Sequence, residues 1–415
     1  MKILICSANY APELTGVGKY SGEMAQWLAA QGHEVRVVAA PPYYPAWQVD
    51  AAYRGRGWFR ERVDRVQVWR VPIWVPKRPS GLQRVLHLMS FGLSSLLPLL
   101  FWALVWRPDM CLCVAPFVTS APGVWFAARL GRSQAWLHLQ DFEVDVAFRI
   151  GLLRGGLMQR AVSALERWVM RRFDRVSSIS QRMLERAAEK GVDVRRLVML
   201  RNWVDVDSIQ PLAGPSIYRA ELDIPQDALV VLFAGTLGLK QGLQLLPPVA
   251  RQLANLHFVV CGHGPMKATL LAECADLGNV HFMPLQPVEC LSELLGLADI
   301  HLLTQDPAAE DLVLPSKLGG MLASGRPVVA TVRLASELGC IVADCGLVVE
   351  PGSADALAAG LQELVGDAAR RRALGLRGRR FAEEHLGREG VLLAAQRAFS
   401  GQSAAAQPVQ PQPGR

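Results

Sequence analysis

Residues 229–246, LVVLFAGTLGLKQGLQLL, constrain the fold of this chain more than any other stretch. The first residues are apolar and include two β-branched valines, which is typical of a strand buried on both faces of a parallel sheet. Three glycines and Lys240 follow, and the spacing of the later leucines predicts a helix. Such a strand, glycine loop and helix can present backbone N–H groups and a lysine to a phosphate. An ordinary βα turn with a solvated lysine explains the same pattern equally well.

Strand-like and helix-like runs alternate on both sides of this stretch. The alternation predicts an α/β protein with two doubly wound, Rossmann-like parallel sheets in its 415 residues. A segment dense in proline and glycine predicts a linker between them. The expected parts are an N-terminal domain (1–205), a linker (206–228), a C-terminal domain (229–385), a helix packing back on the N-terminal domain (386–400) and a disordered tail (401–415).

The composition narrows the classes of partner. The formal net charge of +7 favours an acidic ligand or an anionic membrane surface, and no zinc-finger or basic-region pattern supports nucleic acid. The 8 cysteines include no C-x-x-C pair. Cys6, Cys111, Cys113 and Cys261 occur in apolar runs typical of buried free thiols. We therefore expect a reducing cytoplasm and no structural metal, and the quickly polar N-terminus does not resemble a signal peptide.

The segment 85–106 is long and apolar enough to span a bilayer. It contains Pro98 and three serines and leads into another strand-like run, so a helix covering a parallel sheet is the commoner explanation. The basic residues upstream of it favour a third arrangement, a helix in the membrane interface beside anionic headgroups. These residues are Arg54, Arg56, Arg60, Arg62, Arg65, Lys77, Arg78 and Arg84. We predict a peripheral contact on the cytoplasmic face of the inner membrane rather than a span.

The first βαβ pattern has a loop ending in Gly16 and Gly18. It is not G-x-G-x-x-G, and no acidic residue ends the second strand, which argues against a dinucleotide-dependent dehydrogenase. A tight turn accounts for the two glycines at least as well as a phosphate site. The aromatic loop PPYYPAW (41–47) could line a sugar acceptor site, but a stiff loop with buried rings is the favoured interpretation.

The run AWLHLQDFEVD (135–145) ends another strand in polar residues. Ligands of doubly wound sheets bind at the carboxyl ends of strands. The candidates are His138, Gln140, Asp141, Glu143 and Asp145, with alternation placing His138 and Gln140 on one face and Asp141 on the other. A polar cluster without function is the competing interpretation.

A second candidate cluster follows the strand at 298–303, at the same sheet edge as the 235–242 loop. The loop at 304–315 and the helix after it bring Asp306, Glu310, Asp311 and Lys317 to this edge. Two lysines, backbone amides and a carboxylate suit a nucleoside-diphosphate-sugar. The lysines and helix dipoles supply positive charge, so we expect no cofactor and no required metal.

Taken together, the two glycine loops, G-H-G-P at 262–265 and P-S-K…ASGRPVV resemble the GT-B glycosyltransferases of family 4. PELTGVGKYSGEMAQWLAAQGHEV, APPYYPAWQV, LQDFEVD, LKQGL and LPSKL are similar to the colanic-acid biosynthesis glycosyltransferases, to which fucosyl transfer is assigned. The resemblance covers about residues 1–400 and implies two domains facing a cleft. It also implies retaining transfer from a GDP- or UDP-linked sugar to a polyprenyl-diphosphate-linked saccharide.

The resemblance places donor phosphates at Lys240 and Gly18 and the nucleotide near Gly262 to Gly264. The full expected donor set is Gly16, Gly18, Gly235, Thr236, Lys240, Gly262, His263, Gly264, Glu310, Asp311 and Lys317, and the expected catalytic set is Asp141, Lys240 and Lys317.

The chain departs from the family pattern at three places. Thr236 stands where an arginine is usual, Gln140 where a histidine is usual, and Gly320 where the second glutamate of an E-x7-E pair is usual. We predict that Lys317 replaces the missing arginine. Two other functions stay open, namely a sugar-nucleotide epimerase on the same fold and an inactive membrane-associated subunit.

Overall fold

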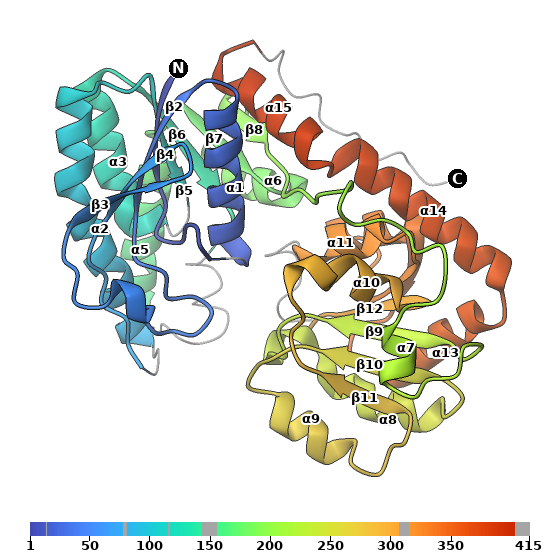
Figure 1. Cartoon of the computed structure of the whole chain (residues 1–415). Helices are drawn as coiled ribbons and strands as arrows, with labels where there is room; N and C mark the ends of the chain where they lie inside the picture. The colour runs from blue at the N-terminus through green and yellow to red at the C-terminus, as the bar shows by residue number, and fades with distance from the viewer. Residues whose placement is uncertain (14, 78–80, 115–116, 143–155, 307–314, 403–415) are drawn as a thin grey trace. The chain divides into compact units, whose positions relative to one another are not determined.

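The computed structural model describes residues 1–13, 15–77, 81–114, 117–142, 156–306 and 315–402. The chain divides into two compact units (Figure 1). The N-terminal unit comprises Met1–Arg201 and Leu392–Arg415, and the C-terminal unit comprises Asn202–Val391. Both contain a mainly parallel sheet covered by helices, which confirms the predicted α/β class.

The N-terminal unit is built on an eight-stranded sheet in the order β3-β4-β2-β1-β5-β6-β7-β8. The strands are β1 (Lys2–Cys6), β2 (Glu34–Ala39), β3 (Phe59–Val63), β4 (Val66–Arg70), β5 (Met110–Val114), β6 (Gln134–Leu139), β7 (Arg175–Ser178) and β8 (Leu197–Met199). The helices are α1 (Gly16–Ala30), α2 (Gly81–Val105), α3 (Phe117–Gly131), α5 (Gly156–Met170), α6 (Gln181–Glu189) and α15 (Arg388–Phe399), with short 3₁₀ turns at Ala51–Tyr53 and Val194–Arg196. Right-handed crossovers place α2, α3 and α5 on one face of the sheet and α1 on the other (Figure 1).

The sequence did not predict β3 and β8. β3 is an edge strand that pairs antiparallel with β4, and its charged residues hide the apolar pattern of a strand. It is held by Arg70, which is fully buried and donates to Glu61 at 2.6 Å and to the carbonyl of Ala40 at 2.8 Å. β8 has only three half-buried residues, too few for a periodic signal.

Helix α2 contains most of the predicted apolar segment and packs one side onto the N-terminal unit. Phe91, Leu99 and Trp102 are buried, and Gly92 lets the helix approach the backbone of Thr119 in α3. The other side is exposed and apolar, and we call it the outer face of α2. It consists of Leu82, Leu86, Met89, Leu93, Leu97, Phe101, Leu104 and Val105. By length and composition alone the helix could cross a membrane, and its buried side packs against α3 and β2.

The C-terminal unit contains a six-stranded parallel sheet in the order β11-β10-β9-β12-β13-β14. The strands are β9 (Val230–Ala234), β10 (His257–Cys261), β11 (Val280–Met283), β12 (Ile300–Thr304), β13 (Val328–Thr331) and β14 (Gly346–Val349). The helices are α7 (Tyr218–Glu221), α8 (Leu246–Gln252), α9 (Lys267–Glu273), α10 (Leu291–Gly296), α11 (Lys317–Ala323), α12 (Glu337–Cys345), α13 (Ala354–Val365) and α14 (Ala368–His385). Short 3₁₀ turns occupy Leu239–Gln241, Leu243–Leu245 and Val288–Cys290.

The segment 206–228, which its composition predicts to be an interdomain linker, packs against the C-terminal unit. Ile209, Tyr218 and Ile224 are buried in the core of the C-terminal unit, so the segment is part of that unit. Proline and glycine density marked irregular backbone correctly but carried no information about packing. The end of the chain belongs to the N-terminal unit, where Phe399 of α15 lies 4.7 Å from the Trp136 ring. The predicted disordered tail, apart from its first two residues, lies outside the described residues.

Candidate active site

Two glycine-rich loops meet at the carboxyl ends of β9 and β10 in the C-terminal unit. The N–H of Gly235 donates to the carbonyl of Cys261 at 2.9 Å, and that of Leu237 donates to His263 at 3.0 Å. A Cβ on Gly262 would lie 2.0 Å from the Gly235 carbonyl oxygen, and one on Gly264 would lie 2.4 Å from that of Leu237. Only glycine allows backbones this close, so the structure brings the two predicted loops into direct contact.

A third loop joins them from the carboxyl end of β12. The N–H of Asp306 donates to the carbonyl of Lys240 at 2.9 Å, and the Thr304 hydroxyl donates to the carbonyl of Gln241 at 2.5 Å. Gly242 has φ +62°, and a Cβ there would lie 3.2 Å from the backbone of Gln305. This close approach fixes the Lys240 turn against the end of β12.

Lys317, the first residue of α11, reaches back to these loops. Its Nζ lies 3.8 Å from the centre of the Phe233 ring and donates to Gln241 Oε1 at 3.2 Å. Its Cδ lies 3.5 Å from the position of a Cβ on Gly235. Lys317 is therefore beside Gly235, the residue that precedes Thr236. Gln241 was not predicted, and its place directly after Lys240 was the signal that could have found it.

The remaining predicted donor residues differ in exposure. Lys240, Thr236 and His263 are exposed, whereas Gly262 is buried. Helix α8 begins only at Leu246, because two 3₁₀ turns replace the first helical turn that the leucine spacing predicted. Glu310 and Asp311 lie outside the described residues.

Burial lowers the pKa of Lys317 to about 7. The ammonium is therefore charged below pH 7 and loses its proton as the pH rises through that value.

If this charge binds a diphosphate, kcat/KM for the donor should fall about tenfold per pH unit on the alkaline side. A pH profile of kcat/KM tests this. In Lys317→Arg the descending limb should disappear, because a guanidinium keeps its proton, whereas in Lys240→Gln the limb should stay at the same pH. An alkaline limb that is unchanged in Lys317→Arg would contradict the assignment.

The glycines of the N-terminal unit lie in the first turn of α1 rather than in the loop before it. Gly18 is buried, and a Cβ there would lie 2.6 Å from Cβ of Glu13. The Glu13 carboxylate accepts from the N–H groups of Tyr43 and Tyr44, each at 2.9 Å, and from Asn9 Nδ2 at 2.9 Å. Gly18 thus makes room for a buried carboxylate that ties the aromatic loop to α1. Sequence reasoning missed Glu13, although it precedes the glycines by only a few residues.

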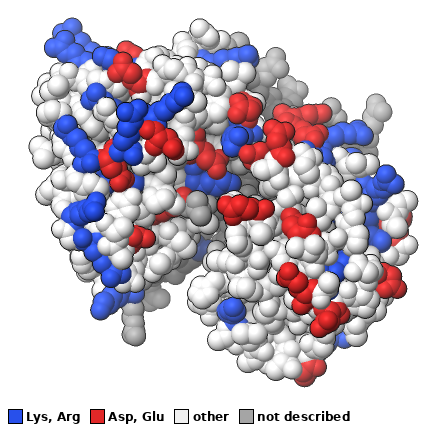
Figure 2. All heavy atoms as spheres, viewed as in Figure 1, with Lys and Arg blue, Asp and Glu red and all other residues white. Residues whose placement is uncertain are grey.

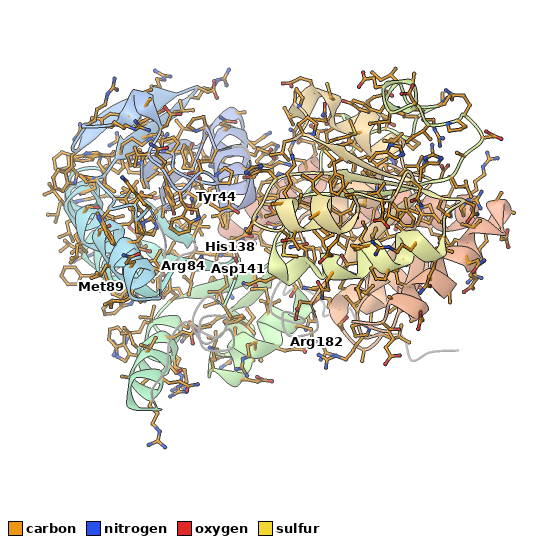
Figure 3. All side chains as sticks on the ribbon, turned by 90° about the horizontal axis from the view of Figure 1, so that it is seen from below. Tyr44, Arg84, Met89, His138, Asp141 and Arg182 are labelled. Atoms are coloured by element: carbon orange, nitrogen blue, oxygen red, sulfur yellow. The ribbon has the colours of Figure 1, made fainter. Side chains whose placement is uncertain are left out.

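The polar residues at the end of β6 include His138 and Asp141, which Figure 3 labels. His138 is buried between Ser177 Oγ at 2.9 Å and Gln140 Nε2 at 2.9 Å, and burial lowers its pKa to about 4. It is neutral at pH 7, and both ring nitrogens are hydrogen-bonded to neighbouring side chains, an arrangement that suits a structural role. Asp141 is half-buried at the end of the strand. The pKa of Tyr44 is raised first by the burial of its own hydroxyl group and then by the negative charge of Asp141. Glu143 and Asp145 lie outside the described residues.

The aromatic loop mostly packs against the protein itself. The Tyr43 ring is buried and lies 4.9 Å from His87, while Trp47 lies 5.3 Å from the same imidazole. Tyr44 is 39% exposed and has Asp141 and Arg84 as charged neighbours. The loop with buried rings is thus the arrangement observed, and Tyr44 is its accessible ring beside Asp141.

Comparisons with known proteins place this geometry in a family. Residues 15–203 match the model of a glycosyl transferase 4-like domain, and residues 228–367 match that of glycosyl transferases group 1. WcaI of Escherichia coli (strain K12), named as a colanic acid biosynthesis glycosyl transferase, is 42% identical over 88% of this chain and 92% of its own length. The chain belongs to the family 4 GT-B glycosyltransferases. This glycosyltransferase is also 27% identical to a 2-deoxystreptamine N-acetyl-D-glucosaminyltransferase of Streptomyces fradiae, over 75% of this chain and 76% of that protein.

Solved structures support the fold of the glycosyltransferase. Sucrose-phosphate synthase from Thermosynechococcus elongatus superimposes with a TM-score of 0.74 at 17% identity, covering 96% of this chain and 98% of its own. HepE of Anabaena, solved in complex with UDP, gives a TM-score of 0.70 at 14% identity over 97% of this chain and all (100%) of its own. At these identities the likeness concerns the fold alone.

Proposed function

We propose that this glycosyltransferase transfers a sugar from a nucleotide-sugar donor to a lipid-linked saccharide, with retention of configuration, in exopolysaccharide assembly. The observation that carries the donor part is the convergence of Lys317, Lys240 and two glycine loops at one sheet edge. The similarity to WcaI supports exopolysaccharide synthesis of the colanic-acid type. Fucose is the sugar that we propose on that basis. The nucleotides to test are UDP, which is bound in the HepE structure, and GDP, which is the nucleotide of a fucose donor.

The donor diphosphate is the leaving group of the proposed reaction. Lys317 and Lys240, with the backbone N–H groups of the glycine loops, stabilise the negative charge that develops on it, so no metal ion is required. Loop backbones held this tightly need little reorganisation, which is how such a site lowers a barrier.

The acceptor hydroxyl attacks the anomeric carbon from the face that the diphosphate leaves. A new C1–O bond forms as the bond from C1 to the phosphate oxygen breaks, and the acceptor proton passes to the departing phosphate. In this scheme no side-chain nucleophile is used. Asp141 holds a hydroxyl of the acceptor or the donor sugar at the carboxyl end of β6.

Asp141→Asn should lower kcat by about 10- to 100-fold, because the amide is a weaker acceptor than the carboxylate for a sugar hydroxyl. The side chain keeps its size, so thermal unfolding should stay unchanged. Initial-rate kinetics at saturating donor would measure the effect, with His138→Gln as the comparison for damage to the fold. Full activity of Asp141→Asn would rule out an essential role for its charge.

A lipid-linked acceptor places the reaction at a membrane, and we propose the cytoplasmic face of the inner membrane. The outer face of α2 supplies the apolar contact. Arg60 lies 5.2 Å from the ring of Phe101 on that face, and Arg84 is on the first turns of the same helix. In Figure 2, Lys and Arg side chains gather on the margin of the N-terminal unit where Figure 1 shows β3 and α2. This charge suits anionic headgroups.

A donor screen tests the proposal. Purified protein is incubated with GDP-fucose, GDP-mannose, UDP-glucose or UDP-galactose, with and without an extract of lipid-linked saccharide. We expect slow hydrolysis of one donor, GDP-fucose, and faster transfer with the extract. Conversion of a donor to its epimer without an acceptor would establish an epimerase instead. Binding without turnover of any donor would indicate an inactive subunit.

A further inference from the structure

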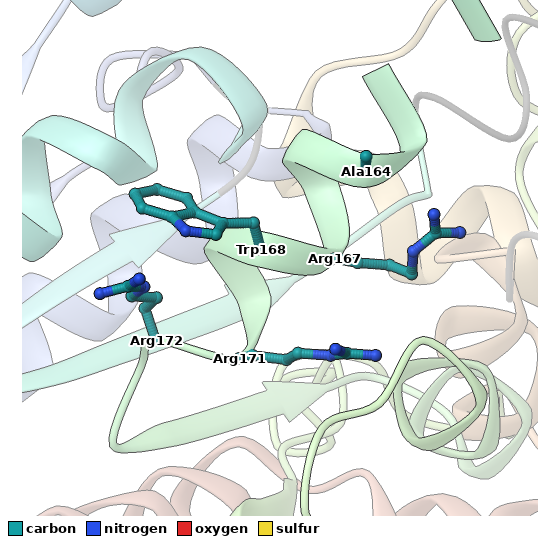
Figure 4. A pocket seen from close by; sticks show the side chains of 5 residues that line it. All are labelled: Ala164, Arg167, Trp168, Arg171 and Arg172. Carbon is teal, nitrogen blue, oxygen red and sulfur yellow. The ribbon is translucent and has the colours of Figure 1, made fainter. Parts of the chain in front are cut away.

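A pocket of about 340 Å³ lies on α5 and the turn that follows it (Figure 4). Its lining contains none of the candidate residues that follow β6 and β12. Its lining consists of Ala164, Arg167, Trp168, Arg171 and Arg172. Three guanidinium groups and an indole around one opening form a cationic and aromatic site that the sugar-transfer chemistry does not use.

The arginines are positioned by contacts that leave their charge available. The Arg172 guanidinium lies 4.5 Å from the Trp168 ring and 5.2 Å from the Trp125 ring, and Arg171 Nε donates to the carbonyl of Lys190 at 3.2 Å.

The carboxylates of this region are engaged elsewhere. Asp174 pairs with Arg129 at 2.7 Å, and Glu166 is buried against Lys190. Within the part of the chain that the structure describes, no carboxylate forms an ion pair with Arg167, Arg171 or Arg172. The pocket therefore lacks an anion from the described protein.

The pocket continues the apolar surface that begins on α2. Helix α3 packs along α2 and exposes Phe126 and Leu130, and α5 exposes Leu165 and Trp168. The Trp125 and Trp168 rings join α3 to α5 at a centroid distance of 6.0 Å. The sequences of α2 and α3 contain no acidic residue, and the acid of α5, Glu166, is buried. An apolar layer whose helices carry no exposed carboxylate, with a cationic pocket on it, has the charge and polarity that complement an anionic bilayer.

We propose that this pocket binds the phosphate of an anionic phospholipid headgroup. The planar guanidinium group of arginine donates two parallel hydrogen bonds to two oxygens of one phosphate. Tryptophan side chains are enriched at the level of the lipid headgroups in a bilayer. The pocket then fixes the orientation in which the outer face of α2 meets the membrane. This inference rests on the proposed membrane contact of α2, but it involves no step of sugar transfer.

Vesicle flotation of the full-length protein tests the site. The probes are phosphatidylcholine vesicles with and without phosphatidylglycerol. We expect binding to the anionic vesicles, and a loss of about 100-fold in partitioning for Arg167→Gln/Arg171→Gln/Arg172→Gln. The matched control is Arg370→Gln/Arg372→Gln/Arg380→Gln on α14, which removes the same charge from the C-terminal unit and should have a much smaller effect.

A charge-preserving variant separates a built pocket from a merely basic surface. Arg167→Lys/Arg171→Lys/Arg172→Lys should bind anionic vesicles about tenfold more weakly than the wild type, because ammonium groups cannot form the paired contacts. Equal binding of this variant, or equal loss in the α14 control, would overturn the pocket while leaving the membrane contact intact. Failure of the wild type to bind any vesicle would overturn both. Inorganic phosphate is the competitor, and chloride at the same ionic strength is its control. If phosphate displaces the protein from vesicles no more than chloride does, the lipid is supported as the source of the bound phosphate. If phosphate stabilises the protein and the protein shows no preference for anionic vesicles, the proposal is contradicted.

Discussion

Replacing Lys317 by methionine is expected to lower kcat/KM for the nucleotide-sugar donor by about 100- to 1,000-fold, the usual cost of removing one preorganised group that stabilises developing charge. Methionine keeps an unbranched stem that can still pack on the Phe233 ring, which Nζ approaches to 3.8 Å. Both kcat and the affinity for the nucleoside diphosphate should fall, because the same charge faces the diphosphate in the donor and in the product. Initial rates and calorimetric titration with the diphosphate measure the two effects.

The control for Lys317→Met is a substitution that changes the side chain but keeps its positive charge. Lys317→Arg should retain most diphosphate affinity if the site needs a cation beside Gly235, although its larger head must displace the hydrogen bond to Gln241. Unchanged donor affinity in Lys317→Met would show that Lys317 does not replace the family arginine. The cation would then have to come from elsewhere in the chain.

Gly262→Ala should both destabilise the C-terminal unit and abolish donor binding. The new methyl group would lie 2.0 Å from the carbonyl oxygen of Gly235, a contact with backbone that no side-chain rotation can relieve. We expect a loss of about 1–3 kcal/mol in the free energy of unfolding, the typical cost of overpacking. We expect a larger loss in donor affinity, because the two loops must separate. Chemical denaturation and diphosphate titration test these effects.

Gly278→Ala is the matched control for this substitution. Gly278 is in the same unit, and a Cβ there meets nothing within 4 Å. Its unfolding free energy should change by no more than about 0.5 kcal/mol and its donor affinity not at all. If Gly262→Ala behaved like Gly278→Ala, the close approach of the two loops would not be needed for binding.

Sequence patterns predicted much of the fold because buried parallel strands are short, apolar and separated by amphipathic helices. β1, β2, β5, β6, β9 and β10 all follow this rule and were predicted near their observed bounds. The edge strand β3, with its charged residues, was missed for lack of an apolar run. The segment at 206–228 was interpreted as a linker because burial of Tyr218 depends on contacts far away in the sequence.

The candidate site was predictable in part. The carboxyl ends of neighbouring parallel strands share an edge, so Lys240, Gly262 and Lys317 could be assigned to one site from the order of strands and loops. The sequence could not predict the hydrogen bond from Lys317 to Gln241 or the buried carboxylate of Glu13, because each depends on side-chain packing between distant loops. His138 was a polar candidate from the sequence, and its burial and its contact with Ser177 could be seen only in the structure.

The sequence by itself determined the α/β class, the succession of most strands along the chain and the glycines that allow the loops of β9 and β10 to touch, because these follow from local periodicity and from residues without side chains. Only the tertiary structure decided which polar groups are available. It buries Lys317 enough to bring its pKa near 7, and it ties up His138. It also leaves the arginines beside Trp168 exposed without an acidic partner among the described residues. Burial and pairing arise from contacts between distant segments, and no local pattern contains them.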